Sequence, residues 1–260
     1  MKKYILLTQK GFLLAITFLF LSNQSIADSR NIQQLEAAEN IEITSQQIAK
    51  AYFYLHQEIR VEQSEQDLKN GLFAIERDIK TLTNTKDKKQ RRMVTFMSFT
   101  LDEIKDIIEK PYTNEHGALM LDYSETLLEG AESLVKKHTH KKYNKEKMLI
   151  ITKQMTFFLE RATKYYIAFR DGFTDHNNVK QLEMAIKGFE SHLKTIQAYK
   201  YSGKPQQAVN KLTEYWPVAK GFYLGIEEND LPLIVSITTR HLEKSLAILE
   251  QYHHDLAVDK

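Results

Sequence analysis

Apolar residues recur along most of the chain at the spacing of one helix face. The stretch 68–82 shows the pattern clearly, with apolar side chains that step by 4, 3, 4 and 3 positions: Leu68, Leu72, Ile75, Ile79 and Leu82. This spacing keeps every side chain on one stripe of an α-helix, the face that packs on a core. Only nine glycines and four prolines interrupt 260 residues, which also favours an all-α protein.

The same pattern returns 114 positions later. At this offset the five apolar positions fall on their counterparts in the second half: Leu182, Ile186, Phe189, Leu193 and Ile196. Lys50 and Tyr52 fall on Lys164 and Tyr166, which are identical residues. A single constant offset over almost the whole chain indicates a duplicated unit.

Each copy is predicted to form four helices. The expected ranges are 31–60, 64–84, 87–109 and 114–138 in copy one, and 147–172, 177–200, 205–225 and 230–256 in copy two. Turn signals such as Lys110-Pro111 and Asp171-Gly172 separate them. Short connections favour antiparallel neighbours, so the predicted fold is two tandem four-helix up-down bundles, 28–144 and 145–260. Two separate bundles and one merged body both fit the pattern.

The first 27 residues have the layout of a secretory signal peptide. Lys2, Lys3 and Lys10 precede or border the 11-residue apolar run Gly11–Leu21, and Ser25-Ile26-Ala27 is a cleavage signal. The run is short of the roughly 20 residues that a membrane-spanning helix needs. We therefore expect cleavage after Ala27 and a periplasmic protein, with an uncleaved anchor as the alternative. The chain has no cysteine, so disulfides and lipoprotein attachment are excluded.

Charge argues against nucleic acid as a partner. Without the three lysines of residues 1–27 the chain carries 33 basic and 34 acidic residues, whereas nucleic-acid-binding domains usually present a strongly basic face. The basic run 136–147 at the join between the copies is interpreted as a solvated linker, with contact to anionic lipid as the alternative.

Sequence signals of catalysis and metal binding are weak. Glu250 and His253 form the only Glu-x-x-His motif, and a di-iron bundle needs two such motifs and two further glutamates. No catalytic triad order, phosphate-binding glycine loop or zinc spacing occurs. We expect no catalytic residues, no metal and no cofactor; a metal-binding bundle is the last of the alternatives.

The first helix resembles a known sequence box. AENIEITSQQIAKAYF, Ala38 to Phe53, is similar to the opening box of the PilJ-type domain, the periplasmic N-terminal domain of type IV pilus chemotaxis transducers. The matching positions are Ala38, Ser45, Gln46, Ile48, Ala49 and Lys50 in copy one, and Glu160, Arg161 and Lys164 in copy two. Two further features are similar to the family: Trp216-Pro217 at the start of a third helix, and a fourth helix shaped like Ser124–Val135.

The resemblance implies a small-anion site, but this chain departs from the family there. Glu42 and Thr156 stand where the family has an arginine, and an ionised carboxylate would repel nitrate. Nitrate sensing is therefore not carried over. A polar band remains as the candidate ligand site: Ser45, Gln46, Gln47, Lys50 and Tyr52, with Glu160, Arg161, Lys164 and Tyr166.

The band predicts a small polar ligand between the two first helices, and the hydroxyls of Tyr52 and Tyr166 could face each other there. An ordinary solvated helix face is the alternative. Together with the resemblance, the band predicts an exported sensory or ligand-binding module, related to chemotaxis and type IV pili, that signals through an envelope or receptor protein. A non-catalytic structural protein of the envelope that has lost its ligand site is the other interpretation.

Overall fold

The computed structural model describes residues 32–138, 147–228 and 230–258. The predicted signal peptide, and residues 139–146 of the basic run, lie outside the described residues. No helix within the described ranges is both long enough and apolar enough to cross a membrane.

The described residues form eight helices and no strand, which confirms the all-α prediction. The helices are the N-terminal helix (32–56), α2 (Val61–Thr83), α3 (Lys88–Ile108), α4 (Asn114–His138), α5 (Lys147–Arg170), α6 (His176–Ala198), α7 (Gly203–Leu224) and α8 (Pro232–Val258). Every expected helix is present, and all boundaries but one lie within three residues of the expected position. The exception is the N-terminal helix, which ends at 56 rather than 60.

Local chemistry explains several of these boundaries. The carboxylate of Asp87 accepts hydrogen bonds from the first backbone N–H groups of α3, and Asp175 does the same for α6. The N-terminal helix ends early because Glu58 and Arg60 take left-handed backbone angles, with φ of 55° and 49°. The position 114 residues after Glu58 is Gly172, which also has a positive φ, of 98°.

One feature expected from the family resemblance is not found. Trp216-Pro217 does not begin a helix but lies well inside α7. Pro217 lacks the N–H that would bond to the carbonyl one turn earlier, a loss that a helix tolerates best in its first turn. The helix begins instead at Gly203, whose φ of 61° suits the turn that precedes it.

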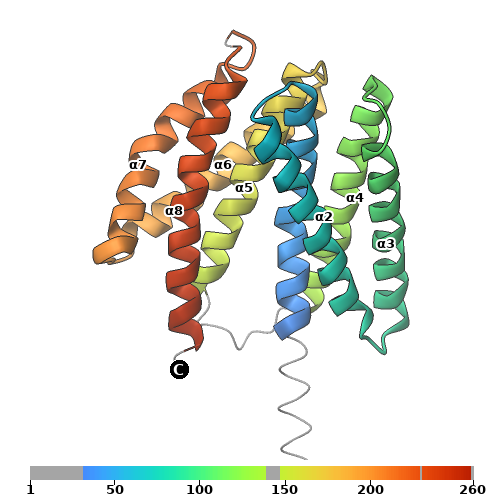
Figure 1. The fold of residues 1–260 in the computed structure, drawn as a ribbon. Coiled ribbons are helices and arrows are strands. Elements are labelled where there is room, and N and C mark those ends of the chain that lie inside the picture. Colours follow the sequence, from blue (N-terminus) through green and yellow to red (C-terminus); the bar gives the residue numbers. More distant parts are fainter. Residues whose placement is uncertain (1–31, 139–146, 229, 259–260) are drawn as a thin grey trace, which may run out of the picture.

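The helices alternate in direction along each half of the chain (Figure 1). The N-terminal helix and α5 lie side by side in the middle of the molecule and run in the same direction. Helix α3 packs against α2 and α4 on one side, and α7 packs against α6 and α8 on the other. The parallel central pair is thus where the two halves meet.

Side chains across this pair contact each other in register. The hydrogen bonds and ion pairs join Glu39 with Lys153 (2.9 Å), Gln46 with Arg161 (3.3 Å), Gln47 with Glu160 (3.1 Å) and Gln57 with Asp171 (3.4 Å). The partners are 113 to 115 positions apart, close to the repeat offset. Two copies of one unit, related by a twofold-like rotation, would give such contacts.

The buried apolar side chains form one continuous cluster. It runs from Ala37 in the N-terminal helix to Leu249 in α8 and includes residues of every helix described. The two halves therefore share a single core, and of the two arrangements that the sequence left open, the merged body is the one observed.

Candidate functional site

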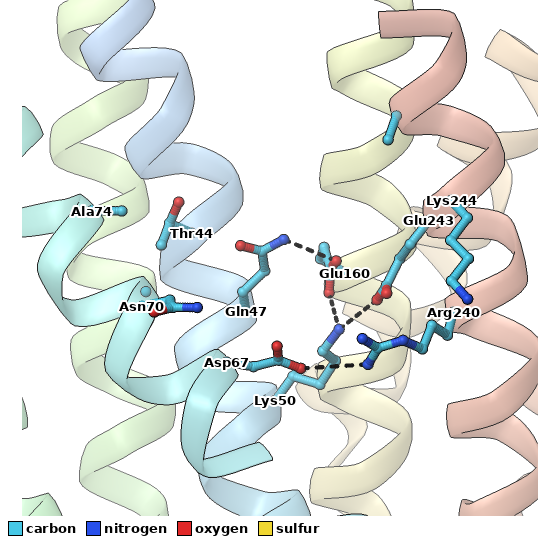
Figure 2. Close-up of a pocket in the computed structure, with 12 residues that line it drawn as sticks. Thr44, Gln47, Lys50, Asp67, Asn70, Ala74, Glu160, Arg240, Glu243 and Lys244 are labelled. Carbon is cyan, nitrogen blue, oxygen red and sulfur yellow. Dashed lines mark hydrogen bonds and ion pairs between the residues drawn. The ribbon is translucent and has the colours of Figure 1, made fainter. Parts of the chain in front are cut away.

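A pocket of about 430 Å³ lies on one flank of the central helix pair (Figure 2). The N-terminal helix and α2 form one side, and α5 and α8 form the other. The pocket is thus lined by both halves of the chain. Its volume falls within the roughly 300–1,000 Å³ of typical small-molecule sites.

The floor of the pocket is an ion cluster centred on Lys50. The Lys50 ammonium lies 2.5 Å from a carboxylate oxygen of Glu160 and 2.7 Å from one of Glu243. Gln47 donates a hydrogen bond to the other oxygen of Glu160, at 3.1 Å. Lys50 comes from the N-terminal helix and its two partners come from α5 and α8, so the cluster bridges the halves.

Burial and neighbouring charges raise the pKa values of Lys50 and Glu160 and lower that of Glu243. Burial opposes the charge of Lys50, but its two carboxylate partners outweigh burial and raise the pKa of the ammonium well above its usual value. Burial raises the pKa of Glu160 to about 7, an effect that Lys50 offsets only in part and Glu243 reinforces. One ammonium cannot neutralise two carboxylates, and the raised pKa of Glu160 places its protonation near neutral pH.

Small residues on α2 open the space above this floor. A Cβ atom at Gly71 would lie 2.5 Å from the side chain of Ile48, so only glycine lets α2 approach the N-terminal helix this closely. Thr44 and Ala74 line the same side. Short side chains here leave a hollow rather than a filled core.

A second polar cluster lies on the α4 and α6 side of α5. Arg161 forms two hydrogen bonds with the carboxylate of Glu125, at 2.9 and 2.7 Å, and a third with Gln181. The fully buried Lys164 lies 2.5 Å from Glu125. Burial would raise the pKa of Glu125, but Lys164 and Arg161 outweigh it and lower that pKa to about 2. Burial lowers the pKa of Lys164 to about 8.

The two clusters pair across the halves in a crossed manner. Lys50 of the first half contacts Glu243 in the last helix of the second half, and Lys164 of the second half contacts Glu125 in the last helix of the first. The position equivalent to Thr44 carries a larger side chain in the second half, however. Phe158 stands 114 positions after Thr44, and its ring packs so tightly on α6 that a Cβ at Gly188 would lie 2.6 Å from it.

Comparisons with protein-family models, with curated proteins and with solved structures found no match to this chain. The resemblance to the PilJ-type domain therefore stays a prediction from the sequence.

The predicted polar band divides between the two clusters. Gln47, Lys50 and Glu160 line the pocket, while Gln46, Arg161 and Lys164 belong to the second cluster. Ser45 is buried and donates a hydrogen bond to the backbone carbonyl of Glu42. No space remains between the two first helices at this level, because Gln46 and Gln47 contact α5 directly. The pocket lies beside the helix pair, not between its members.

The two tyrosines of the band lie in different aromatic clusters. The ring of Tyr52 packs on Tyr112, with centroids 5.6 Å apart, and the ring of Tyr166 packs on Tyr223 at 5.8 Å. Both rings are buried, as core packing would require, and neither lines the pocket.

Glu42 differs from the sequence interpretation in its charge. Burial, together with the nearby Glu132 and Glu39, raises the pKa of Glu42 to about 8. At neutral pH the side chain is mostly a neutral acid, so the repulsion expected from an ionised carboxylate is largely absent.

Sequence reasoning missed the pocket residues contributed by α2 and α8. These are Asp67 and Asn70 on α2, and Arg240, Glu243 and Lys244 on α8. Glu243 carried a usable signal, because it matches Glu129 at the repeat offset. The others match no polar partner of like type, and only the packing of four helices brings them together.

The Glu-x-x-His motif has a different role. His253 is hydrogen-bonded through Nε2 to the hydroxyl of Tyr201, at 2.7 Å. Within the described ranges, no group of three or more histidine, aspartate or glutamate side chains is placed to hold a metal ion.

Proposed function

We propose that this protein is an exported, non-catalytic ligand-binding module, related to chemotaxis-transducer sensor domains, that holds a small polar molecule in the pocket above Lys50. The pocket carries the proposal: it is of small-molecule size, its floor is a buried ion cluster, and both halves of the chain line it. A ligand there would contact both halves at once. Signalling would then pass to an envelope or receptor partner.

The contrast between Thr44 and Phe158 supports this proposal. Both positions belong to the first helix of their copies, yet the larger side chain packs against its neighbouring helix and the smaller one lines a hollow. Different side chains at equivalent positions, one of them lining a pocket, are what a specialised site in a duplicated chain would show.

The matched test places at position 44 the phenylalanine that the second half has at the equivalent position, 158. The purified chain is equilibrated with the small-molecule fraction of a bacterial extract and examined by native mass spectrometry. We expect a bound compound in the original chain and none in Thr44→Phe, with an unchanged adduct in Ser98→Phe, a control on α3 away from the pocket. The absence of any adduct in the original chain, or its persistence in Thr44→Phe, would contradict the proposal.

A second candidate is an interaction protein of the envelope, and one observation favours it. Phe73 on α2 and Phe96 and Phe99 on α3 are more than half exposed, which is unusual for large aromatic residues. In-cell cross-linking from α3, compared between the original chain and a Phe96→Ser/Phe99→Ser variant, tests it. A specific, identified partner lost in the variant would support this function; identical cross-links in both would contradict it.

A further inference from the structure

The side walls of the pocket carry opposite charges. Asp67 and Asn70 project from α2, while Arg240 and Lys244 lie one turn apart on α8 across the pocket (Figure 2). In total three basic and three acidic side chains line the pocket, so its formal charge is balanced. Helix α2 contributes one acidic side chain, Asp67, whereas α8 contributes two basic side chains and one acidic one, Glu243.

The Lys50 ammonium of the floor is already paired with two carboxylates, so the basic side chains available to a ligand carboxylate are those of the walls. Lys50 is held by Glu160 and Glu243 at 2.5 and 2.7 Å. On the walls, Arg240 and Asp67 are 3.9 Å apart, beyond hydrogen-bond distance, and their side chains are 31% and 45% exposed. Exposed pairs of this kind contribute little stability and are readily exchanged for other partners.

Lys244 has no charged partner among the described residues. It is exposed, lines the pocket, and is involved in none of the ion pairs there. Even with Glu243 counted, which pairs with Lys50, α8 carries one more basic than acidic side chain in the pocket. The small residues Gly71 and Ala74 on α2 and Ala247 on α8 also line the pocket.

We propose that the ligand is a small zwitterion of the α-amino-acid type. Its carboxylate would lie between Arg240 and Lys244, its ammonium against Asp67, and its side chain over the small residues. A free anion of similar size would be attracted to Arg240 and Lys244 but repelled by Asp67. A free cation would be attracted to Asp67 but repelled by the two basic side chains. An α-amino acid has its two charges a few atoms apart, so it can replace the loose Asp67–Arg240 pair with two closer ones.

This inference rests on the proposed function and is tested with defined compounds. Binding of each of the twenty L-amino acids to the purified chain is measured by calorimetry, beside ethylamine and propionate, which each keep one of the two charges of alanine. We expect at least one amino acid to bind, and ethylamine and propionate to bind about tenfold more weakly or not at all.

Variants at exposed positions locate the site without disturbing the core. Asp67→Asn and Lys244→Gln should each weaken amino-acid binding by about tenfold or more. Lys211→Gln, an exposed lysine on α7 outside the pocket, is the matched control and should leave it unchanged.

The outcomes separate this inference from the proposed function. Binding of propionate or nitrate that Thr44→Phe abolishes, without amino-acid binding, would overturn the zwitterion and leave the binding function standing. The same holds if no amino acid binds while the extract still gives a Thr44-dependent adduct. Amino-acid binding that Asp67→Asn and Lys244→Gln leave intact would also overturn it. No adduct and no binding would overturn both.

Discussion

Lys50 holds together two carboxylates whose pKa values move in opposite directions. Burial raises that of Glu160 to about 7, whereas for Glu243 the attraction of Lys50 outweighs burial and lowers it. Removing the ammonium would leave the buried carboxylate of Glu160 facing the partly exposed carboxylate of Glu243. Breaking one member out of a buried ion cluster typically costs about 3–5 kcal/mol.

We therefore predict that Lys50→Met destabilises the protein by about 3–5 kcal/mol at pH 8. The loss should be smaller at pH 5, because the stranded carboxylates can take up protons there. Urea unfolding at the two pH values measures it. Lys50→Met/Glu160→Gln is the matched control and should recover part of the stability at pH 8. An equal loss at both pH values would show that packing, not charge, is what Lys50 contributes.

The raised pKa of Glu42 predicts that the free energy of unfolding depends on pH. Its pKa is raised from 4.5 in the unfolded chain to about 8 in the fold, chiefly by burial. Between these values the folded state binds the extra proton, so the free energy of unfolding should fall as the pH rises from about 5 to 8. Glu160 contributes a similar fall at slightly lower pH, because its pKa is raised to about 7 rather than about 8. Between pH 7 and 8 Glu160 still adds to this fall, while Lys164, whose pKa burial lowers to about 8, opposes it, so the part due to Glu42 is the difference between the original chain and Glu42→Gln.

In Glu42→Gln the fall between pH 7 and 8 should become smaller, and the variant should be at least as stable as the original chain at pH 8. Urea unfolding over a pH series gives the slope. Glu65→Gln, at an exposed position on α2, should keep the original dependence. A slope above pH 7 that is unchanged in Glu42→Gln would assign the titration to another group.

At the residue scale, the sequence indicated the polar band but not its surroundings. Lys50 and Glu160 could be picked out because they lie within a repeated, box-like stretch. Whether Glu42 is charged depends on its burial and on Glu132 in another helix, and neither can be recognised from the sequence alone. For the same reason the separate roles of Gln47 and Arg161, which match at the repeat offset, could not be foreseen.

At the scale of the helices, periodicity and turn residues predicted nearly every boundary. The main error came at the end of the N-terminal helix, where no glycine or proline marks the stop. Glu58 takes a left-handed conformation there without the usual residue for it, while Gly172 fills the matching position in the second half. A comparison of the two halves at the offset of 114 residues would have indicated this helix end, because Gly172 falls on Glu58.

This comparison predicts that Glu58→Gly stabilises the protein. Left-handed angles cost a non-glycine residue roughly 1–2 kcal/mol, and glycine loses part of that gain through greater freedom in the unfolded chain. We expect a net gain of about 0.5–1 kcal/mol, measured by thermal or urea unfolding. Glu65→Gly, at an exposed position in the second turn of α2, should instead destabilise by a similar amount. A loss of stability in Glu58→Gly would mean that the glutamate side chain makes a contact worth more than the backbone strain.

At the scale of the whole molecule, the sequence left open how the halves meet. Short loops predicted antiparallel neighbours, and the chain obeys this within each half. The parallel contact between the N-terminal helix and α5 joins elements more than 110 positions apart, so no local rule could supply it. The shared core and the crossed Lys50–Glu243 and Lys164–Glu125 pairs follow from that contact.

The shared core predicts that neither half is stable alone. Fragments 28–144 and 145–260 would each expose one central helix, and each would hold a buried lysine without its carboxylate partner. We expect the separate fragments to self-associate or to unfold at lower urea than the intact chain, and to form a one-to-one complex when mixed. Light scattering after size-exclusion chromatography and circular dichroism measure this. Two stable monomeric fragments that ignore each other would show that the halves are independent domains.

Because the two central helices run in the same direction, the fold does not depend on which half comes first in the chain. The N-terminal helix begins, and α8 ends, at the same end of the molecule where α4 ends and α5 begins (Figure 1). A circular permutant that starts at α5, ends at α4 and joins residue 258 to residue 32 through a short linker would keep every contact between helices. The two halves are thus interchangeable in sequence while distinct in chemistry, since only their side chains, and not their place in the chain, decide which flank carries the pocket.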